Sequence, residues 1–112
     1  MSKVYIPHIP NRRDRETNIF VPTIDVTPAN EYGELVTLLP PTASFHATGD
    51  LIDMLRPFAR TYNFEDGDCI VAVGDPSILA IVFGLVASMH SKFNLLKWDR
   101  SIHRYVKVKI VL

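Results

Sequence analysis

The sequence predicts a small single-domain α/β protein whose mixed sheet has about five strands, and three observations lead to this fold class. The chain has 112 residues, which is the size of one domain. An apolar run at residues 69–73 is followed by a Gly-Asp-Pro-Ser turn and a longer apolar run, the pattern of a buried parallel strand that leads into a helix. Two strand-like segments then end the sequence. The expected order is β-β-α-β-α-β-β, with a Rossmann-like β-α-β-α-β core and a C-terminal hairpin.

Residues 1–31 are predicted to form an extended arm, and residues 32–112 the α/β domain. Proline fixes φ and has no N–H to donate, so neither a long helix nor a central strand is expected in a segment that contains four of them: Pro7, Pro10, Pro22 and Pro28. One edge strand is expected near residues 19–26. A second strand is expected at residues 34–39, where two prolines end it.

Two helices are predicted. The first begins at about Thr48, and Pro57 is expected to kink it or end it early. Its apolar residues repeat at spacings of four, three and four and are expected to face the core: Leu51, Leu55, Phe58 and Tyr62. The second helix covers residues 76–89, with Asp75 as N-cap and Pro76 at the first helical position, an arrangement that helices favour.

The last two strands are predicted at residues 93–98 and 105–112. In the second of them apolar and polar side chains alternate, as in a strand with one buried face. One face carries Val106, Val108, Ile110 and Leu112, and the other carries Tyr105, Lys107 and Lys109. The hairpin is therefore expected to have one wet, basic face.

The charges are unevenly distributed along a chain with no net charge. Residues 17–89 contain two bases and nine acids, whereas residues 90–112 contain six bases and one acid. Such asymmetry indicates either a basic surface for nucleic acid or complementary patches that meet in an oligomer. The zero net charge favours the oligomer, because little long-range field remains to attract a polyanion.

The first candidate site is the turn that contains Gly74, Asp75 and Ser77. It follows the carboxyl end of a predicted central strand, where open α/β sheets bind ligands, and a helix N-terminus attracts anions. However, Pro76 removes one N–H donor and the Asp75 carboxylate lies where a phosphate would bind. We therefore favour a helix cap at Asp75, and small-molecule or nucleotide binding is the alternative.

The second candidate is the helix at residues 76–89, because apolar side chains surround its axis. A helix that is apolar on all sides must be covered on all sides, and one sheet covers only about half of it. Ala80, Gly84 and Ser88 lie on one face at spacings of four, which allows another helix to approach closely. We expect this face to pack against the same helix of a second subunit in a two-fold homodimer. The alternative is that the proline-containing arm covers it.

The third candidate is the C-terminal hairpin, in which bases alternate with aromatic residues. Single-stranded nucleic-acid binders use cations for phosphates and rings for base stacking. The residues in question are Lys97, Trp98, Arg100, Arg104, Tyr105, Lys107 and Lys109. The alternative is an edge hairpin whose lysines prevent sheet-to-sheet aggregation.

No catalytic constellation, metal-ligand spacing or cofactor motif is present, so we expect a protein that is not an enzyme. The single cysteine, Cys69, allows no internal disulfide and is expected to be buried and inert. No secretory signal or membrane-spanning run is evident. These observations predict a cytoplasmic protein without membrane contact.

Three segments together resemble small uncharacterised proteins of tailed bacteriophages. They are residues 12–40 (RRDRETNIFVPTIDVTPANEYGELVTLLP), 71–80 (VAVGDPSILA) and 95–105 (LLKWDRSIHRY). The resemblance implies an accessory or structural role inside a bacterial host and implies nothing about catalysis. The leading hypothesis is a non-catalytic, self-associating interaction protein whose partner is a phage or host protein, reached through the arm or the hairpin.

Overall fold

A five-stranded mixed sheet forms the centre of the protein in the computed structural model, which describes residues 2–40 and 48–112. Its strand order is β4-β1-β5-β6-β7. The first four strands in this order run parallel, and β7 pairs with β6 as an antiparallel hairpin. The strands are β1 (Lys3–Ile6), β4 (Glu34–Thr37), β5 (Cys69–Val71), β6 (Lys92–Asp99) and β7 (Arg104–Val111).

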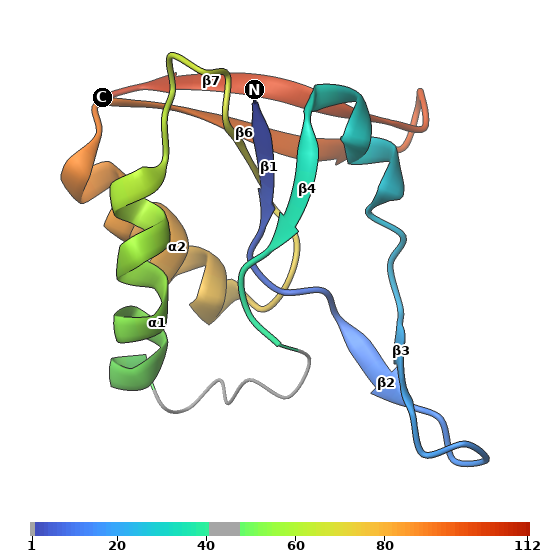
Figure 1. Cartoon of the computed structure of the whole chain (residues 1–112). Coiled ribbons are helices and arrows are strands. Elements are labelled where there is room, and N and C mark those ends of the chain that lie inside the picture. The colour runs from blue at the N-terminus through green and yellow to red at the C-terminus, as the bar shows by residue number, and fades with distance from the viewer. Residues whose placement is uncertain (1, 41–47) are drawn as a thin grey trace.

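The two helices, α1 (Thr48–Thr61) and α2 (Pro76–Met89), lie side by side on one face of this sheet (Figure 1). Their buried side chains form one core with those of the strands, in which Tyr5 of β1 packs edge-on against Phe58 of α1 at 4.8 Å. On the opposite face, the 3₁₀ helix η1 (Thr27–Tyr32) places Ala29 over β1 and β5. The sheet is therefore covered on both faces, which explains why β5 is apolar throughout.

The structure confirms the α/β fold class, the mixed five-stranded sheet and the C-terminal hairpin. The second predicted helix is observed with the expected bounds, and the first begins at Thr48 as expected. All four residues of the predicted apolar stripe are buried, three of them in α1 and Tyr62 directly after its end. The helices were predictable because the N-cap of α2 and the apolar periodicity of α1 are local signals.

The prediction that no central strand precedes residue 31 is wrong. Residues 3–6 form β1, which lies between β4 and β5 and pairs in parallel with both. Pro7 does not prevent this pairing because β1 ends at Ile6, one residue before it. The β-formers Val4, Tyr5 and Ile6 are the local signal for this strand.

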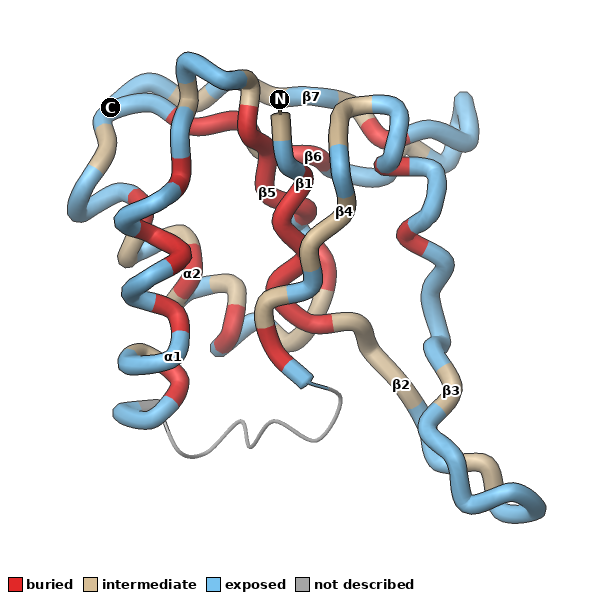
Figure 2. Tube along the Cα trace, viewed as in Figure 1, coloured by how far each residue is buried: buried red, intermediate tan, exposed pale blue. Residues whose placement is uncertain are grey.

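The expected edge strand at residues 19–26 is also wrong in extent and position. Only β3 (Phe20–Pro22) is a strand, and it pairs with β2 (Asn11–Arg13) in a separate two-stranded hairpin. This hairpin projects away from the sheet (Figure 1), and its residues are mostly exposed (Figure 2). The remainder of the arm returns along residues 23–26 to η1.

Pro57 neither ends nor shortens α1, contrary to the expected early end, because the helix continues to Thr61. Pro57 is exposed. The carbonyl group that loses its helical partner therefore lies on the solvent side, where it is accessible to water.

Asp68 connects the loop before β5 to the beginning of β1 through hydrogen bonds. Its Oδ1 accepts the backbone N–H of Lys3 at 2.9 Å, and its Oδ2 accepts the N–H of Asn63 at 2.9 Å. The Asp68 carbonyl accepts the hydroxyl of Tyr62 at 2.7 Å and the amide of Asn94 at 3.1 Å. One residue thus joins β1, β6 and the end of α1.

Cys69 is fully buried in β5, and desolvation raises the pKa of its thiol. Both effects disfavour the reactive thiolate. We expect a disulfide-exchange reagent at mildly alkaline pH to react with the native protein at a small fraction of its rate with the protein in denaturant. Absorbance of the released thiol measures both rates. Equal rates would show that β5 opens readily.

Candidate functional site

The solvent side of α2 is a helix surface without charge or long side chains. Only Ile78, Val82 and Val86 of this helix are buried, and they lie on the side that faces the sheet. The opposite side is exposed and carries Pro76, Ser77, Ala80, Gly84, Ala87 and Ser88. We call these six residues the small-residue face of α2.

The small-residue face is uncovered by the described parts of the chain. A Cβ placed on Gly84 would have no atom within 4 Å. The Ser88 hydroxyl donates to the Leu85 carbonyl of its own helix at 2.7 Å, so this polar group does not depend on water. The alternative that residues 2–31 cover this face is wrong, because the buried arm residue Val26 packs on the other side of the sheet.

Asp75 caps α2 through its carboxylate, which accepts the N–H of Ser77 at 2.8 Å. Gly74 adopts a φ of 118°, and a Cβ there would lie 2.8 Å from the carbonyl oxygen of His8. The turn at Gly74 therefore lies in close contact with His8, in the segment that follows β1. Ligand binding by Gly74, Asp75 and Ser77 stays a prediction.

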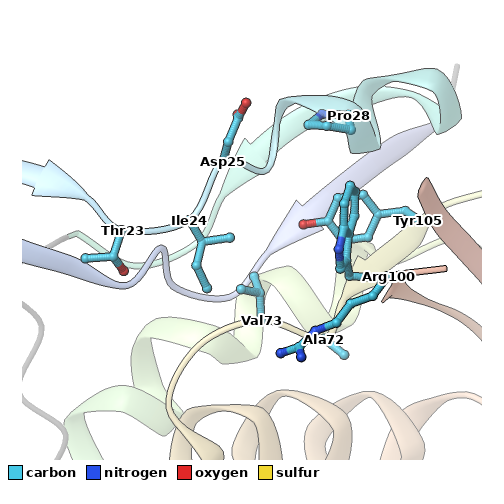
Figure 3. A pocket seen from close by; sticks show the side chains of 9 residues that line it. Thr23, Ile24, Asp25, Pro28, Ala72, Val73, Arg100 and Tyr105 are labelled. Atoms are coloured by element: carbon cyan, nitrogen blue, oxygen red, sulfur yellow. The ribbon is translucent and has the colours of Figure 1, made fainter. Parts of the chain in front are cut away.

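A cavity of about 570 Å³ lies at the carboxyl ends of β5 and β6 (Figure 3). Ala72 and Val73 directly follow β5, and Arg100 directly follows β6. Arm residues 23–28 form the opposite wall. The lining residues are Thr23, Ile24, Asp25, Pro28, Ala72, Val73, Trp98, Arg100 and Tyr105. We call this space the arm–hairpin cavity.

The polar groups of the arm–hairpin cavity differ in orientation. The guanidinium of Arg100 extends toward Ala72 and Val73, whereas the carboxylate of Asp25 points away from them (Figure 3). The N–H of Thr27 donates to that carboxylate at 2.9 Å, and the bonds from Thr27 lower the pKa of Asp25. Burial of Tyr105, and to a lesser extent the charge of Asp25, raises the pKa of the Tyr105 phenol, so its hydroxyl is a neutral donor.

The family of the protein is evident from nearly the whole chain and not from this cavity alone. A family profile described as Phage Pam3 gp32-like protein matches residues 2–112. The chain belongs to the Phage Pam3 gp32-like family. This finding confirms the resemblance to small phage proteins indicated by residues 12–40, 71–80 and 95–105. No curated protein and no solved structure matches the chain.

The basic residues of the hairpin in this Pam3 gp32-like protein do not form a single surface. Lys97 lies on the helix-covered face of β6, whereas the neighbouring Trp98 lies on the opposite face. Arg104 contacts the Glu31 carboxylate at 3.2 Å. Lys107 and Lys109 lie over aromatic rings, at 5.6 Å from the Tyr32 centroid and 5.5 Å from the Phe64 centroid.

Of the seven predicted nucleic-acid residues, the fold brings only Trp98, Arg100 and Tyr105 into one cavity. The rings of Trp98 and Tyr105 pack edge-on at 5.1 Å. The arm residues that complete this cavity were not predicted, and nothing in the local sequence of residues 23–28 marks them as its wall. Nucleic-acid binding by the hairpin stays a prediction.

Within residues 2–40 and 48–112, no group of three His, Cys, Asp or Glu side chains is placed to hold a metal ion. In the same ranges, every helix is too short or too polar to cross a membrane.

Proposed function

We propose that this phage protein is a non-catalytic accessory or structural protein that self-associates through the small-residue face of α2. The observation that carries the proposal is that a 14-residue helix with no charged side chain has six exposed residues on its small-residue face. Exposed helix faces of globular proteins normally carry charged and polar residues. A face without them is suited to burial.

A second copy of the chain is the occupant that this face fits. Because it carries no charge, two copies related by a two-fold axis bring no like charges together. Ala80, Gly84 and Ser88 follow one another at spacings of four, so two helices could approach with their backbones close. The half-buried side chains of Ile81 and Phe83 flank the face and would add apolar contacts.

The projecting β2–β3 hairpin would then remain free to bind a phage or host protein in the host cytoplasm. It lies on the far side of the molecule from α2 (Figure 1). Its exposed residues include the bases Arg12 and Arg13 and the apolar Ile19. Self-association and partner binding would therefore use separate surfaces.

Substitution of Gly84 by arginine is expected to convert the dimer to a monomer. The long charged side chain prevents close approach of the helices, and we expect the dissociation constant to rise at least tenfold, about 1.4 kcal/mol. Sedimentation equilibrium at several concentrations measures it. Circular dichroism should show an unchanged fold, because Gly84 faces open space and arginine favours helices.

The matched control is Gly49→Arg in α1, since a Cβ on Gly49 also meets no atom within 4 Å. We expect this variant to dimerise like the unmodified protein. A protein that is monomeric at every concentration, or a Gly84→Arg variant that dimerises as well as the Gly49→Arg control, contradicts the proposal.

A further inference from the structure

The arm–hairpin cavity combines an apolar body with one charged group that faces inward. Ile24, Pro28, Val73 and the Trp98 ring provide the apolar walls. Ile24 and Trp98 are each 42% exposed, so a bound molecule could reach both. Small-molecule sites have this composition, mostly apolar with a few convergent polar groups, and volumes of about 300–1,000 Å³.

The position of the cavity also fits a ligand site. Open α/β sheets bind ligands beyond the carboxyl ends of their parallel strands. The cavity lies beyond β5 and β6, and the space beyond β1 is closed because Gly74 contacts His8. The carboxyl ends of β5 and β6 are therefore the open part of this edge.

The charged groups around the cavity indicate which kind of ligand it could bind. The Asp25 carboxylate points outward and accepts a bond from Thr27, which leaves the Arg100 guanidinium as the ionised group directed inward (Figure 3). Among the described residues Arg100 forms no ion pair. Arg100 is an exposed residue, and a guanidinium can bind a carboxylate or phosphate with two parallel hydrogen bonds.

A second polar group faces the same space. Tyr105 is 4% exposed, and its hydroxyl points toward the arm residues (Figure 3). In residues 2–40 and 48–112, no group hydrogen-bonds to this hydroxyl. The hydroxyl of this lining residue is therefore available to a ligand in the cavity as a hydrogen-bond partner.

We propose that the arm–hairpin cavity binds a small planar aromatic anion, with its ring against Trp98 and its anionic group on Arg100. Nucleoside monophosphates and aromatic carboxylates share this chemistry. The site differs from the Gly74–Ser77 turn and from the small-residue face of α2. It is therefore independent of self-association.

The indole N–H resonance of Trp98 reports binding directly, because the chain has a single tryptophan. Adenosine 5′-monophosphate and benzoate are each titrated into ¹⁵N-labelled full-length protein. Uncharged adenosine serves as the control for adenosine monophosphate, and benzyl alcohol as the control for benzoate. We expect at least one anion to shift the Trp98 resonance in a saturable way, and its uncharged counterpart to bind at least tenfold more weakly.

Variants of the cavity complete the test. Arg100→Ala should weaken binding of the anion by about tenfold or more, since a hydrogen-bonded charge pair is lost. Arg60→Ala, which removes an exposed arginine from α1, should leave binding unchanged. Tyr105→Phe should weaken binding of the anion, while the NMR spectrum of the free variant should still be that of a folded protein.

Three results would overturn the proposal: no saturable shift with either anion at millimolar concentration, equal affinity for the uncharged counterparts, or equal affinity in the Arg100→Ala and Arg60→Ala variants. Saturation by only one of the two anions supports the site and identifies which anionic group it takes. Binding to the Gly84→Arg variant separates this test from the proposed dimer, because a monomer should bind the same ligand.

Discussion

Substitution of Gly74 by alanine is expected to lower the free energy of unfolding by about 2–4 kcal/mol, because backbone strain and steric overlap both oppose the new side chain. The φ of 118° at this position is one that alanine adopts only under strain. The added Cβ would also lie 2.8 Å from the His8 carbonyl oxygen, and a backbone atom cannot move away as the end of a side chain can. Urea denaturation followed by circular dichroism measures the change.

Gly49→Ala is the matched control for this substitution. Gly49 lies in the first turn of α1 and has open space around it, so alanine should leave stability unchanged or raise it by up to about 1 kcal/mol. Alanine should therefore destabilise the protein at position 74, whereas at position 49 it should leave the free energy of unfolding unchanged or raise it. Equal unfolding midpoints for the two variants would show that the turn at Gly74 relaxes freely, contrary to its contact with His8.

Replacement of Asp68 by alanine is expected to lower the free energy of unfolding by about 2–4 kcal/mol. The carboxylate accepts backbone N–H groups from Lys3 and Asn63, and alanine leaves both without this acceptor. Asp68 is 3% exposed, so water does not readily replace it. Asp68→Asn keeps one acceptor oxygen and should lose less stability.

Asp66→Ala provides the comparison for Asp68→Ala. Asp66 is an exposed carboxylate two residues away, and its side chain makes no hydrogen bond to the described residues. We expect its removal to change stability by less than about 0.5 kcal/mol. If both aspartate variants unfold at the same denaturant concentration, the bonds from Asp68 to β1 and to the end of α1 contribute nothing measurable.

The parts of the fold that were predictable from sequence are those with strong local signals. An Asp-Pro pair before an apolar run marks the start of α2, and alternation marks β7. The central strand β1 was missed because it has four residues and a proline follows directly. Its three β-formers are a weak local signal, and its central position depends on pairing with β4 and β5, which the local pattern does not show.

The candidate sites also differ in whether the local sequence allowed them to be predicted. The small-residue face of α2 could be predicted because spacing along one helix determines which residues share a side. The arm–hairpin cavity could not, because its walls come from residues 23–28, 72–73 and 98–105. Only the path of the arm back across the sheet brings Ile24 to Trp98 and Tyr105.

The central place of β1 has a consequence for synthesis of the chain on a ribosome. Val4 pairs with Leu35 on one side and with Cys69 on the other, so one edge of β1 stays unpaired until β5 has been translated. Pairings between distant segments slow folding and leave apolar strands exposed meanwhile. β1 is thus made well before β5, the strand that completes its pairing, and truncations that remove β1 would separate β4 from the remaining strands.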